Sequence, residues 1–227
     1  MATAEAFVKK VQSAYDEKWG YIWGTRGEMW TAEKQAAATR AQTKSYGAKW
    51  IGHHVADCSG LIKWALLQLG KDCPHGSNSI WKNSLRVKGE LKNGAPVGYA
   101  TKLRPGSLVF KKNGDDVYHV GVYEGNGYVI EAQSTQTGVV KSKVTKWHLW
   151  GELKALDYEG GIPVATDISK DNQAKVVGGT LNVRTSESTA SERLAQLANG
   201  SKVEVESING EWAKIKLEGY VMKKFLD

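Results

Sequence analysis

A cysteine, a histidine and a glutamate stand in that order at positions 58, 119 and 131 of this 227-residue chain. A thiol can attack a carbonyl carbon, and an imidazole can accept the thiol proton and return it to a leaving group. A carboxylate can hold the imidazole in one orientation while this happens. Cys58, His119 and Glu131 are therefore candidate catalytic residues for the hydrolysis or transfer of an acyl group.

The residues that follow Cys58 predict a helix that begins beside it. Apolar residues recur at helical spacing from Leu61 to Leu69, and Gly70 is a natural stop. Asp57 stands where an N-cap residue belongs. Free backbone N–H groups and the helix dipole favour a thiolate in the first turn, so the position predicts an activated thiol. The alternative reading is a small buried cysteine without a chemical role.

His119 lies in the first of two strand-like runs, residues 117–123 and 128–132, which a glycine-rich turn connects. The two runs predict a β-hairpin. A three-residue loop would place Glu131 diagonally beside His119 on the same face, whereas a two-residue loop would turn Glu131 to the opposite face. The first case gives a base with its orienting carboxylate, and the second gives a strand histidine apart from a solvated glutamate.

Five segments in sequence order resemble the NlpC-type peptidoglycan endopeptidases, compact papain-like enzymes that cut short wall peptides. The segments are Tyr-Ile-Trp-Gly at 21–24, Asp-Cys-Ser-Gly-Leu-Ile at 57–62, Leu-Arg-Pro-Gly-Ser-Leu-Val-Phe at 103–110, His-Val-Gly-Val-Tyr at 119–123 and Gly-Asn-Gly at 125–127. The resemblance covers most of residues 15–140. It implies a nucleophilic Cys58 and a basic His119.

The chain departs from the family pattern at three places. Glu131 stands where the family most often has a second histidine, and a carboxylate can fill the same orienting role. Ser107 replaces the usual aspartate of the strand before the histidine. Residues 25–56 form a longer insertion, in which the alanine-rich stretch 31–40 predicts a capped helix. This helix could line one side of a cleft or decorate the surface.

The resemblance also implies roles around the nucleophile. The Cys58 thiolate would attack the carbonyl, and His119 would protonate the leaving amine. The backbone N–H of Cys58 and the side chain of Tyr21 would hold the oxyanion. Asp57 and Ser59 match family positions that help to bind the free amino end of the substrate peptide, with a helix cap and a first-turn hydroxyl as their alternative roles.

Other chemistry has less support in the sequence. Cys73 and His75 lack the paired spacing of a structural zinc site, so we predict no metal and no cofactor. A disulfide between Cys73 and Cys58 would silence the nucleophile. We therefore expect two free thiols, with Cys73 in a structural role.

Charge is distributed unequally between the two parts of the chain. The first 160 residues hold 22 Lys/Arg and 15 Asp/Glu, whereas residues 161–227 hold nine of each. A basic catalytic surface would be attracted to anionic wall polymers. Nucleic acid is the competing polyanion, but the basic residues are dispersed and no nucleic-acid-binding motif accompanies them, so we predict no nucleic-acid partner.

No apolar stretch is long enough to span a membrane. Residues 2–19 have apolar residues at helical spacing among charges, which predicts an amphipathic helix instead of a secretion signal. We expect an extracellular, wall-associated protein, which would require either a signal trimmed from this chain or release by another route, such as that of a phage lysin.

The composition changes near residue 160, and residues 161–172 predict a polar linker. Residues 173–227 contain short strand-like runs at 181–184, 202–205, 212–216 and 219–221, which predict a small all-β domain. Leu-Asn-Val-Arg, Gly-x-x-Val and Trp-x-Lys-Ile elements resemble a bacterial SH3-like wall-binding module. Trp212 and Tyr220 are candidate ligand contacts, although Trp212 suits core packing better.

The predicted fold is α+β, with a papain-like catalytic domain over residues 1–160 and an SH3-like barrel over residues 173–227. The predicted function is that of a monomeric cysteine endopeptidase that cuts the stem peptide between D-glutamate and a diamino acid. An N-acetylmuramoyl-L-alanine amidase, a non-catalytic wall-binding protein and an acyltransferase of similar fold are the alternatives.

Overall fold

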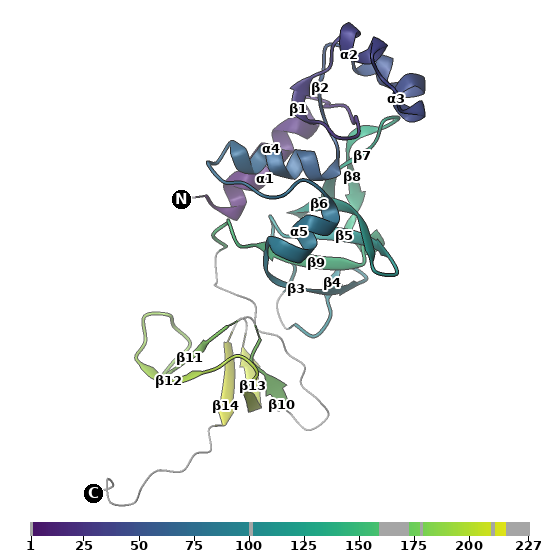
Figure 1. Cartoon of the computed structure of the whole chain (residues 1–227). Helices are drawn as coiled ribbons and strands as arrows, with labels where there is room; N and C mark the ends of the chain where they lie inside the picture. Colours follow the sequence, from purple (N-terminus) through teal and green to yellow (C-terminus); the bar gives the residue numbers. More distant parts are fainter. Residues whose placement is uncertain (1, 100–101, 159–172, 178, 210–211, 217–227) are drawn as a thin grey trace, which may run out of the picture. The chain divides into compact units, whose positions relative to one another are not determined.

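The computed structural model describes residues 2–99, 102–158, 173–177, 179–209 and 212–216 (Figure 1). Contacts between residues divide the chain into two compact units near residue 161. The predicted linker at 161–172, the predicted strand at 219–221 and Tyr220 lie outside the described residues.

The first unit is built on a seven-stranded sheet with the strand order β4-β3-β9-β5-β6-β7-β8. Its strands are β3 (Leu85–Lys92), β4 (Ala95–Pro96), β5 (Leu108–Asn113), β6 (Asp116–Gly125), β7 (Tyr128–Ser134), β8 (Gly138–Lys143) and β9 (Leu149–Leu153). Neighbouring strands are antiparallel throughout. Strand β6 pairs with β5 along residues 116–122 and with β7 along residues 122–125, so the ladder with β5 holds the backbone at His119.

The hairpin of β6 and β7 has the two-residue turn of one predicted form and the strand register of the other. Its tip is a two-residue turn, with Asn126 and Gly127 at φ angles of 52° and 80°. A β-bulge at Glu124 then shifts the register by one residue. Because of this bulge, Glu131 faces the same side as His119, as the longer loop predicts, although the turn itself has two residues.

Two helices pack side by side on one face of the sheet, α1 (Ala4–Asp16) and α4 (Cys58–Leu67) (Figure 1). Burial of Leu61, Ile62 and Leu66 stabilises α4 against the sheet by roughly 1.5–3 kcal/mol for each side chain. This packing fixes the start of α4, and with it the position of the cysteine.

Both predicted helices in this layer are confirmed. Helix α1 lies within the predicted span 2–19, with the Thr3 hydroxyl as its N-cap. Helix α4 begins at the predicted cap Asp57. The chain leaves α4 through Gly70, which adopts the left-handed conformation with a φ of 67°. A third helix, α5 (Ser77–Asn83), packs against β6.

Gly60 sets how closely α4 approaches the preceding segment. A Cβ atom at this position would lie 1.9 Å from the carbonyl oxygen of Thr25, so any side chain would push the helix away. Thr25 precedes β1 (Arg26–Met29), which pairs with β2 (His54–Ala56). The glycine of the Asp-Cys-Ser-Gly motif therefore brings the segment that contains Tyr21 against the start of α4.

The helix predicted over residues 31–40 begins as expected after the cap Thr31, but its predicted extent to residue 40 is wrong. The segment forms α2 (Ala32–Ala36), and after a break come α3 (Ala41–Tyr46) and the 3₁₀ helix η1 (Gly47–Trp50). Helix α2 buries none of its residues, so the alanine-rich sequence has little packing to extend it. Gln35 instead accepts a hydrogen bond from the Trp30 indole at 3.0 Å and donates one to the Thr43 carbonyl at 3.1 Å, which folds the chain back.

In the second unit the described residues form a small all-β arrangement, as predicted. Strands β10 (Gln173–Lys175), β13 (Lys202–Asn209) and β14 (Trp212–Lys216) make one antiparallel sheet, and β11 (Leu181–Arg184) pairs with β12 (Arg193–Leu197). Ala174, Val203 and Val205 form its buried core. Across both units, the helices of the described residues are too short or too polar to cross a lipid bilayer.

Candidate active site

Cys58 is the first residue of α4 and is buried. Burial, and after it the negative charge of Asp57, raise the pKa of the Cys58 thiol to about 12. The backbone N–H groups of Val120, Ser59 and Cys58 act in the opposite direction and lower it. The backbone N–H groups at the helix start therefore lower the pKa of the thiol, as predicted, but burial and Asp57 raise it by more. Cys58 rests as a thiol, not as the thiolate that its position alone predicts.

A resting thiol needs a base within reach. The backbone N–H of Val120 interacts with the sulfur of Cys58, so the sulfur lies beside the residue that follows His119 on β6. Cys58 and Val120 also belong to the hydrophobic core in which α4 packs against the sheet. The fold thus brings the start of α4 to the strand that carries the imidazole.

His119 and Glu131 form a short, buried hydrogen bond. The Nε2 atom of His119 lies 2.6 Å from Oε2 of Glu131, and the two residues are 8% and 1% exposed. With Nε2 committed to the carboxylate, Nδ1 is the nitrogen that can take up the thiol proton. The predicted base and orienter are therefore in contact, as the hairpin register requires.

The charge of Glu131 is stabilised although its environment is dry. Burial raises the pKa of Glu131, but the hydrogen bonds from His119 and Ser142 and the positive charges of His119 and Lys111 together hold it below its usual value. Lys111 lies 3.7 Å from Oε2 of Glu131 and belongs to β5, the strand beside β6. The carboxylate is thus ionised at neutral pH and can stabilise an imidazolium.

An indole ring fixes the plane of the imidazole. Trp147 stacks on His119 with ring centroids 5.5 Å apart and an angle of 16° between the planes. Gly121 makes room for this ring, because a Cβ atom there would lie 2.9 Å from Trp147. The ammonium group of Lys111 lies 4.6 Å from the centroid of the same ring. Indole and carboxylate together leave the imidazole little freedom to turn.

Asp57 is held entirely within the protein. Its carboxylate accepts hydrogen bonds from the backbone N–H groups of Gly60 at 2.7 Å and Gly24 at 2.8 Å, and from the hydroxyl of Ser59 at 3.0 Å. His75 Nε2 lies 2.9 Å from both carboxylate oxygens. These contacts make Asp57 a cap that ties α4 to the Tyr21 segment. A role of Asp57 or Ser59 in binding a substrate amine stays a prediction, and it would require His75 to move aside.

Tyr21 lies close to the nucleophile. Burial, followed by the charges of Cys58 and Asp57, raises the pKa of the Tyr21 hydroxyl far above its usual value, against a lowering effect of Arg40. The phenol therefore keeps its proton at all ordinary pH values. A protonated hydroxyl can donate a hydrogen bond, and the role of Tyr21 as a donor to a developing oxyanion stays a prediction.

A family model described as the NlpC/P60 family matches residues 21–153, more than half of the chain. The chain belongs to the NlpC/P60 family. A second model, described as a bacterial SH3 domain, matches residues 179–227. Both resemblances noted in the sequence are thereby confirmed.

Relatives of this NlpC/P60 chain include a protein of Corynebacterium glutamicum (strain R) named "Probable endopeptidase", 36% identical over 106 residues, which are 45% of this chain and 44% of that protein. "Probable endopeptidase p60" of Listeria innocua is 31% identical over 98 residues, 43% of this chain and 19% of that protein. The chain thus spans less than half the length of these curated relatives. The solved NlpC/p60 domain of the peptidoglycan hydrolase SagA is 18% identical, with a TM-score of 0.43, and covers 66% of this chain and 99% of its own.

The sequence analysis missed three side chains that contact Asp57, His119 or Glu131. His75 was considered only as a metal ligand, and nothing in its spacing indicates its contact with Asp57. Trp147 is one of nine tryptophans without a distinguishing motif. Lys111 could have been found, because a register that pairs the strand before the histidine with β6 places Lys111 opposite His119.

Proposed function

We propose that this chain is a cysteine endopeptidase that hydrolyses an amide bond in the peptidoglycan stem peptide, between D-glutamate and a diamino acid. The observation that carries the proposal is the buried hydrogen bond of 2.6 Å between His119 and Glu131. His119 lies on β6, and the backbone N–H of the next residue, Val120, interacts with the sulfur of Cys58. The names of the curated relatives support an endopeptidase.

The proposed reaction follows from these contacts. As the Cys58 sulfur attacks the carbonyl carbon, its proton passes to Nδ1 of His119, and Glu131 stabilises the imidazolium that forms. The backbone N–H of Cys58 and the hydroxyl of Tyr21 donate to the oxyanion. The tetrahedral intermediate collapses, the scissile C–N bond breaks, and the leaving amine takes the proton from His119. Water then attacks the thioester with His119 as base, which releases the acid and restores the thiol.

The remaining parts of the chain fit an enzyme that works on the cell wall. We propose that residues 1–160 form the catalytic domain, residues 161–172 a linker and residues 173–227 a wall-binding domain. A tether of this kind raises the local concentration of substrate without any new contact at the catalytic site. The positive charge of residues 1–160 would add attraction to anionic wall polymers. The protein would act outside the cell, as a monomer.

Mass spectrometry of purified peptidoglycan after digestion tests the proposal. The wild-type protein should release fragments cut after D-glutamate, and Cys58→Ala should release none. Cys73→Ala is the matched control, because Cys73 is a second buried thiol outside the proposed site and should leave the fragments unchanged. Absence of fragments from several wall types would contradict the proposal and favour a wall-binding protein.

The same digest separates the enzymatic alternatives. An amidase would free the lactyl carboxyl group from the alanine of the stem peptide, whereas an endopeptidase leaves that alanine attached to the glycan. An acyltransferase would transfer the peptide to an added amine in preference to water. The proposal requires alanine to stay on the glycan and water to be the acceptor.

A further inference from the structure

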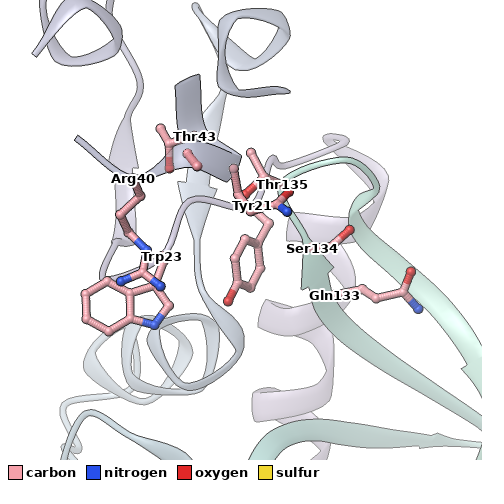
Figure 2. Close-up of a pocket in the computed structure, with 9 residues that line it drawn as sticks. Tyr21, Trp23, Arg40, Thr43, Gln133, Ser134 and Thr135 are labelled. Carbon is pink, nitrogen blue, oxygen red and sulfur yellow. The ribbon is translucent and has the colours of Figure 1, made fainter. Parts of the chain in front are cut away.

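A pocket of about 440 Å³ opens beside the proposed site and is not used by the reaction described above. Tyr21, which neighbours Cys58, forms part of its wall (Figure 2). The residues 40–43 of the insertion form another part, and residues 133–135 at the end of β7 complete it. The insertion therefore contributes to the pocket wall through the start of α3, and of the predicted helix over residues 31–40 only Arg40 takes part.

Arg40 supplies the only charged side chain among the residues that line the pocket. Its guanidinium group lies 4.1 Å from the ring centroid of Trp23, and Figure 2 shows the two side chains together at one side of the pocket. Trp23 is 58% exposed, an unusual state for the largest apolar side chain. Arg40 forms no ion pair with an acidic side chain in the described part of the chain.

The charge of Arg40 acts towards the catalytic centre. It lowers the pKa of the Tyr21 hydroxyl, against the larger raising effects of burial and of Cys58. The pKa of the Tyr21 hydroxyl is thus influenced both by the guanidinium of Arg40 and by the thiol of Cys58. Arg40 and Tyr21 line the same pocket, so a group bound by Arg40 would lie in the pocket next to the proposed nucleophile.

We propose that Arg40, steadied by Trp23, binds a free carboxylate of the substrate residue that donates the scissile carbonyl. This inference rests on the proposed function. A glutamyl residue has two carboxyl groups, and only one of them can take part in the bond that is cleaved. The second stays beside the scissile carbonyl as a carboxylate or, where it is amidated, as a neutral amide. A guanidinium fork pairs with a carboxylate through two parallel hydrogen bonds and cannot do so with an amide.

The site would thereby distinguish two forms of one peptide. The free-carboxylate form gains a charge-assisted pair in a pocket without a lining acid, whereas the amidated form gains at most a neutral hydrogen bond. Arg40 is exposed, which limits the gain to about tenfold in kcat/KM. It acts on specificity and takes no part in bond cleavage.

Two synthetic stem peptides, identical except for a free or amidated non-scissile glutamyl carboxyl, test this with the whole 227-residue chain. The wild type should cleave the free-carboxylate peptide about tenfold more efficiently through a lower KM. Arg40→Gln should lose this preference and keep its rate on the amidated peptide, and Arg40→Lys should recover part of it. Lys44→Gln is the matched control, because it removes one exposed charge from the same insertion outside the pocket lining.

The outcomes separate the inference from the function on which it rests. Cleavage of both peptides with equal efficiency, or an equal loss on both in Arg40→Gln, would overturn the role of Arg40 and leave the endopeptidase standing. Cleavage of neither peptide by the wild type would overturn both. Binding to Cys58→Ala, measured by calorimetry, gives a second readout: adding Arg40→Gln should weaken the free-carboxylate peptide about tenfold and leave the amidated peptide unchanged.

Discussion

Two buried glutamates on the same sheet are held in contrasting ways. Glu152 on β9 is fully buried, and Arg86 and Arg104 donate hydrogen bonds of 2.7–3.1 Å to its carboxylate. Glu131 on β7 is equally buried, but its charged partners are His119, in direct contact, and Lys111, further away at 3.7 Å, while the neutral Ser142 side chain adds a hydrogen bond.

The difference lies in whether the partner can change its charge. An arginine keeps its proton at any ordinary pH, so Glu152 sits in a permanent ion-pair cluster, in which the loss of one partner would leave a buried charge uncompensated. A histidine gains and loses its proton near neutrality, so the interaction of Glu131 with His119 strengthens at the moment when the imidazole becomes charged. The first carboxylate suits a structural role and the second a catalytic one.

The largest effect is expected from Glu131→Gln. The variant keeps the shape of the side chain but cannot stabilise an imidazolium, so kcat on a stem peptide should fall about a hundredfold or more. Its stability should change by less than about 2 kcal/mol, because a hydrogen bond to His119 is still available. Steady-state kinetics with parallel urea unfolding would check both values. A small kinetic loss with a large loss of stability would make Glu131 structural.

Glu152→Gln should show the reverse pattern. It leaves two guanidinium groups, with side chains 21% and 16% exposed, without their counter-charge. The cost should be about 3 kcal/mol, which lowers the melting temperature of the first unit by roughly 6–12 °C. Activity per folded molecule should stay the same below the transition. A hundredfold loss in kcat at an unchanged melting temperature would remove the contrast between the two glutamates.

Lys111→Gln should have a smaller effect, of about two- to fivefold on kcat/KM. Removing the ammonium group raises the pKa of Glu131, so the acid limb of the pH–activity profile should move to higher pH. Lys112→Gln is the matched control, because the next residue on β5 pairs instead with the exposed Glu90. Equal profiles for the two variants would show that Lys111 does not influence the carboxylate.

The smallest effect concerns stability in acid. The pKa of Glu131 is lowered in the folded protein, so its ionised form contributes stability above about pH 4.5, which is lost as the pH falls through the folded value. Glu131→Gln has no such group. In urea titrations from pH 5 to pH 3, the unfolding free energy of the wild type should therefore fall more steeply than that of the variant. A constant difference would contradict the lowered pKa.

The sequence predicted the features that local patterns determine. The cap at Asp57 and the helix after it follow from residue types within a few positions, and alternation in the hairpin restricted Glu131 to two placements. The bulge at Glu124, which selects between them, depends on how the whole sheet pairs. The contact of His75 with Asp57 joins residues 18 positions apart through tertiary packing, and the thiol state of Cys58 depends on burial that no local pattern reports.

The activation of Cys58 by His119 is the central claim, and the rate of alkylation by iodoacetamide tests it without any substrate. The measurement uses a Cys73→Ser background, so that only one thiol reacts, and compares wild type, His119→Ala and Glu131→Gln at pH 7. We predict that His119→Ala slows alkylation of Cys58 about tenfold or more, with Glu131→Gln between the two. Equal rates in wild type and His119→Ala would show that the imidazole does not act on the thiol.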